Sequence, residues 1–186
     1  MPVDDAVTRP DFFSFRAQLS AAIARRDEAA LLAAVDPGIR TSFGDGTGID
    51  AFARQLREPE SAVWGELGAV LALGGAFRSA TSFEAPYVFA RWPERLDSFE
   101  CAAVTGARVR VRATADPASA VVGTVSYDIV RLVGSAPAAG GLRQVALANG
   151  VSGYVAGRFV RSPVAYRAIF QDTGGQWRLA AFVSGD

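Results

Sequence analysis

The sequence predicts an α+β protein in three parts. We expect a helix-rich α+β domain over residues 1–103, a small five-strand β-barrel over 104–162, and a C-terminal β-hairpin over 163–186 that packs on the first domain. Apolar residues recur every three or four positions in the first part, and they alternate with polar residues in short runs afterwards. With 186 residues, half of them apolar, the chain suits one compact domain or two small ones.

Four helices and four strands are predicted in the first part. The spacing of the apolar side chains from Phe12 to Ile23 places them on one face of a helix. Asp27 is expected to cap a second, short helix, which the Asp36-Pro37-Gly38 turn ends. The predicted helices cover 12–23, 29–35, 50–56 and 61–71, and the predicted strands cover 39–43, 77–80, 87–92 and 99–103.

Five short strands are predicted in the second part. The run from Val109 to Arg112 alternates valine with arginine, which is typical of a strand with one buried face. The Asn149-Gly150 pair lies between two apolar runs and predicts a tight hairpin turn. The expected strands cover 109–112, 121–125, 129–133, 145–147 and 151–155.

The last part has the pattern of a hairpin, with two apolar runs separated by Thr173-Gly174-Gly175. Several of its side chains are too apolar for a free chain end, and we expect them to bury against the N-terminal helices. These side chains are Phe170, Trp177, Leu179 and Phe182.

The composition excludes several classes of chemistry. The chain has no histidine, so triads with an imidazole base and histidine–metal sites are excluded. All 19 basic residues are arginine, which excludes a lysine Schiff base and a Walker-type phosphate loop. The single cysteine, Cys101, is expected to be a buried, inert thiol. We therefore expect no enzyme activity, no cofactor and no metal.

Charge is unevenly distributed although the net charge is zero. Residues 1–103 hold ten arginines and fifteen acids, whereas residues 104–162 hold seven arginines and two acids. A basic segment can indicate a nucleic-acid partner, but the acidic segment of the same chain is a partner that is always close by. We therefore favour intramolecular docking over nucleic acid. We see no signal peptide and no transmembrane segment.

Residues 44–50, Gly-Asp-Gly-Thr-Gly-Ile-Asp, are rich in glycine and acids. A dinucleotide fingerprint would need glycine at Ile49, and a calcium loop would need glycine at Asp50. The segment is best interpreted as a tight turn before a helix. Its carboxylates, Asp45 and Asp50, are the candidate pocket acids of the first domain.

Two motifs in the second part resemble those of the bacterial Src-homology-3-like family. The opening motif spans 109–125, and the closing motif, Gly150-Val151-Ser152-Gly153-Tyr154-Val155, precedes Phe159. The resemblance covers residues 104–161 and implies a barrel that binds peptides or peptidoglycan fragments, commonly in the cell envelope. The chain departs from the family pattern at Leu142-Arg143, where tryptophan is usual, and at Arg110, where asparagine is usual.

A second resemblance involves both ends of the chain. Residues 15–52 are similar to the opening of nuclear-transport-factor-2-like domains, and the hairpin at 166–182 is similar to that fold's closing strands. This resemblance implies a cone-shaped α+β domain into which the barrel is inserted, or on which it packs.

Together these observations predict a non-catalytic binding protein. The expected ligand is a protein, a peptide or a peptidoglycan fragment of the cell envelope, recognised by the barrel. The candidate ligand-binding residues are Tyr127 and Tyr154, as rings lining a groove, and Arg110 and Arg158, as partners for a carboxylate. The alternative is a small cone-shaped enzyme or ligand carrier with Asp45 or Asp50 in its pocket.

Overall fold

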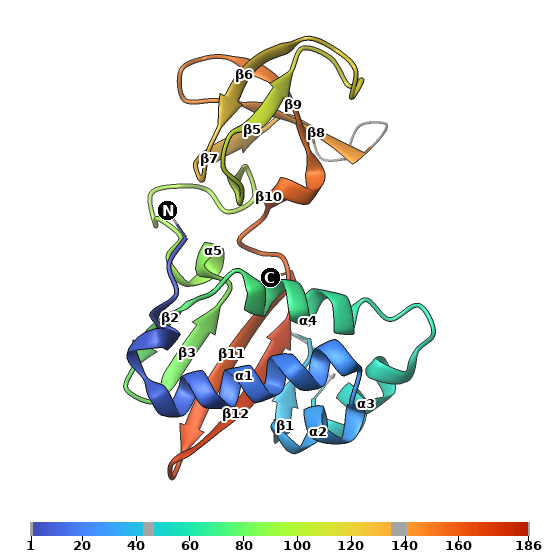
Figure 1. Cartoon of the computed structure of the whole chain (residues 1–186), viewed down its shortest axis with the longest axis vertical. Coiled ribbons are helices and arrows are strands. Elements are labelled where there is room, and N and C mark those ends of the chain that lie inside the picture. The colour runs from blue at the N-terminus through green and yellow to red at the C-terminus, as the bar shows by residue number, and fades with distance from the viewer. Residues whose placement is uncertain (1, 43–46, 135–140, 186) are drawn as a thin grey trace. The chain divides into compact units, whose positions relative to one another are not determined.

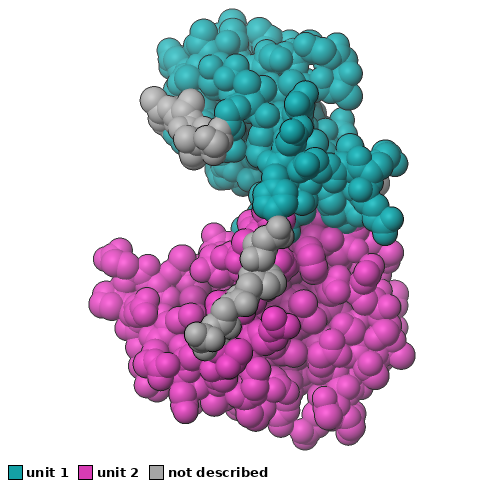
Figure 2. Space-filling view, turned by 180° about the vertical axis from the view of Figure 1, so that it is seen from behind, with its two compact units in different colours: residues 1–2, 92–163 teal, residues 3–91, 164–186 magenta. Residues whose placement is uncertain are grey.

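The computed structural model describes residues 2–42, 47–134 and 141–185, and its fold is mixed α+β with two sheets (Figure 1). The chain divides into two compact units, which are coloured separately in Figure 2. Unit 1 comprises residues 1–2 and 92–163, and unit 2 comprises residues 3–91 and 164–186. Unit 2 is therefore discontinuous in sequence, and the chain returns to it after completing unit 1.

Unit 2 contains the predicted helices. Asp27 caps α2 as expected, because its carboxylate accepts a hydrogen bond from the N–H of Ala30 at 3.0 Å. The Ser61 hydroxyl accepts one from the N–H of Val63 at the start of α4. The helices are α1 (Pro10–Arg25), α2 (Glu28–Ala33), α3 (Ile49–Arg57), α4 (Val63–Ala72) and α5 (Tyr87–Ala90), with a 3-10 turn at Asp5–Thr8.

The sheet of unit 2 has five strands in the order β1-β12-β11-β3-β2. Its strands are β1 (Val35–Arg40), β2 (Ala76–Ser79), β3 (Ser82–Ala85), β11 (Arg167–Thr173) and β12 (Gln176–Val183). The pair β1–β12 is parallel and the other pairs are antiparallel. The predicted C-terminal hairpin is thus present as β11 and β12, which occupy the middle of the sheet.

The core of unit 2 is built around aromatic rings between α1 and the sheet, and Figure 1 shows α1 running across the strands. Phe12 is fully buried, with its ring centre 4.3 Å from that of Phe83 and 4.8 Å from that of Trp177. The four apolar side chains expected to bury in the hairpin all belong to the same buried cluster as Phe12. Burial of these rings joins the two ends of the chain in one hydrophobic core.

The structure of unit 2 differs from the predictions at three places. The expected strand at 87–92 is a helix, α5, whose Phe89 and Ala90 N–H groups donate to the Pro86 carbonyl. The strand β3, which we did not predict, lies between β11 and β2 in the sheet. The strand expected at 39–43 begins earlier, at Val35, so that the Asp36-Pro37-Gly38 turn lies within β1. The turn itself forms, because the Gly38 N–H donates to Oδ1 of Asp36 at 2.8 Å, and the pairing of β1 with β12 is irregular between Val35 and Arg40.

Unit 1 contains a second, antiparallel sheet. Its strands are β4 (Cys101–Val104), β5 (Val109–Arg112), β6 (Val121–Val125), β7 (Ile129–Leu132), β8 (Leu142–Ala146), β9 (Ser152–Ala156) and β10 (Val160–Arg161). The predicted Asn149-Gly150 turn connects β8 and β9. The core consists mainly of valines from these strands, including Val111, Val145 and Val155, all fully buried.

The five predicted strands are all present in unit 1, but the sheet differs from a closed five-strand barrel. It has seven strands in the order β10-β4-β7-β8-β9-β5-β6, and within the described residues no pairing joins β10 to β6. The two additional strands pair with each other, Val104 opposite Val160, and β4 extends the sheet beyond β7. Cys101 on β4 is half-buried, and burial raises the pKa of its thiol.

Candidate functional site

A cavity of about 350 Å³ in unit 1 is lined by four arginines, Arg108, Arg110, Arg112 and Arg158. The first three lie on or next to β5, and the fourth lies in a short 3-10 turn, Gly157–Phe159, after β9. The remaining lining residues are mostly apolar: Ala107, Val109, Pro117, Leu142, Ala156 and Phe159. The cavity therefore combines a strongly basic rim with an apolar wall.

Arg110 and Arg112 line the cavity and lie on the same face of β5. Val109 and Val111 are 5% and 0% exposed and pack in the core, so Arg110 and Arg112 project from the other face of the sheet. Arg112 is held in place, since its Nη1 donates to the Ser119 carbonyl at 2.7 Å. The β5 backbone thus sets the spacing of these guanidinium groups.

Arg108 and Arg158 are positioned by turns. Arg108 has a φ of 50°, and its backbone N–H donates to the Ser126 hydroxyl at 2.7 Å. The Arg158 guanidinium carbon lies 4.7 Å from the centre of the Phe159 ring, a cation–π arrangement. Gly157 is required there, because a Cβ would lie 2.6 Å from the Gly141 carbonyl oxygen.

No carboxylate lines the cavity among the residues that the structure describes. The ion pair that the structure shows in unit 1, Arg131 with Glu100 at 3.1 Å, lies outside the lining. Arginines that line one cavity without an acid produce a positive potential there, and arginine donates paired hydrogen bonds to carboxylates and phosphates. The arrangement is suited to binding an anionic group.

The structure brings together two of the predicted ligand-binding residues. Arg110 and Arg158 line the same cavity, although they are far apart in sequence. Tyr154 on β9 is half-buried and lies opposite Arg112 in the sheet, next to the lining. Tyr127 follows β6, is 37% exposed and donates its backbone N–H to the Gly106 carbonyl. Neither tyrosine is part of the cavity lining.

Our sequence reasoning did not select Arg108, Arg112 and Phe159 for this cavity. The alternation of β5 already places Arg110 and Arg112 on one face of the strand, and this signal could have identified Arg112. Arg108 precedes the strand and is positioned by a turn. Phe159 is a third aromatic residue of this segment, but in sequence a core role is the more common interpretation for it than a place on the ligand face.

The candidate pocket acids of the first domain do not form a site in the described structure. Asp45 lies outside the described residues, and Asp50 is exposed in the first turn of α3. Unit 2 has a larger cavity of about 830 Å³, and Asp50 does not line it.

Within the described ranges, no cluster of three or more histidine, cysteine or acidic side chains could hold a metal ion. None of the described helices combines the length and apolar character needed to cross a membrane. No protein-family model matches the chain, and the comparison with curated proteins finds no significant relative.

Proposed function

We propose that this protein is a non-catalytic binding protein, and that unit 1 recognises the carboxylate of a protein or cell-envelope component. The observation that carries the proposal is that four arginines line one cavity that has no carboxylate in its described lining. Arg112 is already held by Ser119, so Arg108, Arg110 and Arg158 are the groups that would pair with a ligand. A charged hydrogen bond of this kind contributes roughly 1.5–3 kcal/mol.

The apolar wall narrows the choice of ligand. Leu142, Phe159 and Pro117 line the cavity beside the arginines, so the anion would be attached to a small apolar group. A peptide C-terminus provides this combination, because its carboxylate is adjacent to its last side chain. Peptides of this kind occur in proteins and in the stems of peptidoglycan.

The resemblance to bacterial Src-homology-3-like domains supports the same proposal. The consecutive strands β5 to β9 cover the motifs that carry the resemblance, and the turn glycine Gly150 has a φ of 84°. We propose that these strands are the Src-homology-3-like part of unit 1, with β4 and β10 added at one side. We propose likewise that unit 2 is related to nuclear-transport-factor-2-like domains. A small enzyme or carrier that uses Asp50 has less support, since Asp50 lies outside the large cavity of unit 2.

The test is binding of the full chain to two probes: hexapeptides immobilised through their N-termini, with free or amidated C-termini, and purified peptidoglycan. We expect retention by free C-termini and by peptidoglycan, and loss on amidation. Arg110→Gln and Arg158→Gln should each weaken binding about tenfold or more. Arg131→Gln is the matched control, because Arg131 lies outside the lining.

The same binding experiment is made with Tyr127→Ala and Tyr154→Ala. Because neither ring lines the cavity, we expect smaller losses of affinity than for the arginine variants. Absence of binding to both probes, or full binding by both folded arginine variants, would contradict the proposal.

A further inference from the structure

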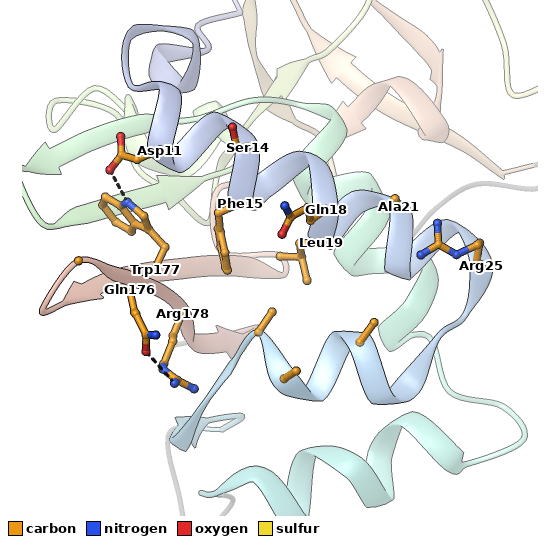
Figure 3. A pocket seen from close by; sticks show the side chains of 14 residues that line it. Asp11, Ser14, Phe15, Gln18, Leu19, Ala21, Arg25, Gln176, Trp177 and Arg178 are labelled. Atoms are coloured by element: carbon orange, nitrogen blue, oxygen red, sulfur yellow. Dashed lines mark hydrogen bonds between the residues drawn. The ribbon is translucent and has the colours of Figure 1, made fainter.

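The cavity of unit 2 lies between α1, α2 and the beginning of β12, as Figure 3 shows, and has a volume of about 830 Å³. Pockets for small organic ligands typically measure about 300–1,000 Å³. We call this cavity the α1–α2 groove. It shares no lining residue with the arginine cavity of unit 1.

The long sides of the α1–α2 groove are apolar. Phe15 and Leu19 reach into it from α1 (Figure 3). On the opposite side, the lining residues of α2 and its C-cap are all alanines: Ala30, Ala33 and Ala34. Short side chains on α2 leave the space between the helices open, where leucine would fill it.

The negative charge of Asp11, the acid in the described lining, is already balanced by an arginine. Its carboxylate accepts from Nε and Nη2 of Arg9 at 3.0 and 2.7 Å and from the Trp177 indole at 2.9 Å. These bonds hold the pKa of the Asp11 carboxyl well below its usual range. Asp11 therefore adds little repulsion toward an anionic ligand.

Two arginines of the lining lack a carboxylate partner among the described residues. The Arg178 guanidinium is held by neutral acceptors, with Nη1 3.4 Å from the Val35 carbonyl and Nη2 3.2 Å from Gln176 Oε1. Figure 3 shows Arg178 and Gln176 near one end of the groove and Arg25 near the other. Arg178 is the better anchor because it is half-buried and held in place, whereas Arg25 is exposed.

From this arrangement we propose that the α1–α2 groove binds an anionic amphiphile, a single acyl chain with a carboxylate head. The chain lies against Phe15, Leu19 and the alanines of α2. The carboxylate accepts hydrogen bonds from Arg178 and from the amide of Gln176. Charge complementarity at this end selects an acid over an uncharged compound of the same length.

Titration calorimetry of the full chain with dodecanoate tests the proposal, with dodecanol as the uncharged control and acetate as the head group alone. We expect dodecanoate to bind below its micellar concentration, dodecanol about tenfold more weakly, and acetate not at all. Arg178→Gln should reduce the affinity for dodecanoate to that for dodecanol. Ala33→Leu should weaken the binding of both dodecanoate and dodecanol, because the leucine side chain fills the groove. The substitution lowers helix propensity only slightly.

Arg54→Gln is the matched control, because Arg54 is exposed on α3 and outside the groove. Thermal unfolding verifies that each variant is folded, and Ala30→Leu replaces Ala33→Leu if the latter fails to fold. The proposal is overturned if dodecanoate does not bind, if Arg178→Gln binds it as tightly as wild type, or if the folded leucine variant retains full affinity. It is also overturned if Arg110→Gln, and not Arg178→Gln, weakens binding, since the amphiphile would then occupy unit 1. Binding of the hexapeptides to Arg178→Gln tests the proposed function of unit 1 separately, because Arg178 lies outside the arginine cavity.

Discussion

The Trp177 indole Nε1 donates a hydrogen bond to Oδ2 of Asp11 at 2.9 Å. This bond joins the start of β12 to the first turn of α1. The two elements lie near opposite ends of the sequence, and the residues of unit 1 come between them in the chain. Arg9 completes the arrangement, because it binds the same carboxylate and lies 5.6 Å from the Trp177 ring centre. A single carboxylate therefore connects the C-terminal hairpin with the first helix of unit 2.

This relationship predicts how the stability of unit 2 depends on pH. The hydrogen bond from Arg9, and then that from Trp177, lowers the pKa of Asp11 in the folded protein. A lowered pKa stabilises the fold above the ordinary carboxyl pKa of about 4, and this contribution is lost as the pH falls toward the folded-state value. The urea midpoint of the wild type should therefore decrease more between pH 7 and about pH 3 than that of Asp11→Asn. Equal decreases would show that Asp11 contributes no such linkage.

The aromatic core predicts a large difference between two phenylalanines of unit 2. Phe170 on β11 is fully buried, with its ring centre 5.6 Å from that of Phe12, whereas Phe13 on α1 is 46% exposed. Phe170→Ala should lower the free energy of unfolding by about 3–5 kcal/mol, because it leaves a cavity in the core. Phe13→Ala is the control and should cost less than about 1 kcal/mol. Urea denaturation measures both, and similar losses would contradict the central role of the hairpin.

The sheet of unit 1 predicts opposite outcomes for two strand glycines. A Cβ at Gly153 on β9 would lie 2.5 Å from the Arg112 carbonyl oxygen and 2.7 Å from Val111 Cγ1. Gly153→Ala should therefore destabilise unit 1 by about 1–3 kcal/mol through overpacking. At Gly123 on β6 nothing lies within 4 Å, so Gly123→Ala should be neutral or stabilise by up to about 1 kcal/mol. Thermal unfolding of both variants tests this, and a stable Gly153→Ala protein would be evidence against the close approach of β5 and β9.

Gly153 also matters for the arginine cavity. Because it allows β9 to approach β5 at Arg112, its replacement should shift Arg112 and weaken peptide binding together with stability. The strand glycine in the closing motif thus has a physical role next to the proposed binding site.

Local patterns in the sequence determined many of the elements. The spacing of apolar residues from Phe12 to Ile23 predicted α1, and Asp27 predicted the start of α2. The Asn149-Gly150 pair predicted the turn between β8 and β9, and the alternation after Arg108 predicted β5. These predictions succeeded because caps, turns and amphipathic faces depend on residues a few positions apart.

Contacts between distant residues were decided only by the tertiary structure. Residues 87–90 became α5 because burial of Tyr87 and Val88 outweighed the strand preference of the aromatic residues. Residues 82–85 became β3 because they pair with β11 and β2. Arg158 joined the arginines of β5 only because β9 pairs with β5. Likewise, Asp11 and Trp177 met because α1 packs on the central hairpin. Such encounters depend on how whole elements share a core, which no short stretch of sequence encodes.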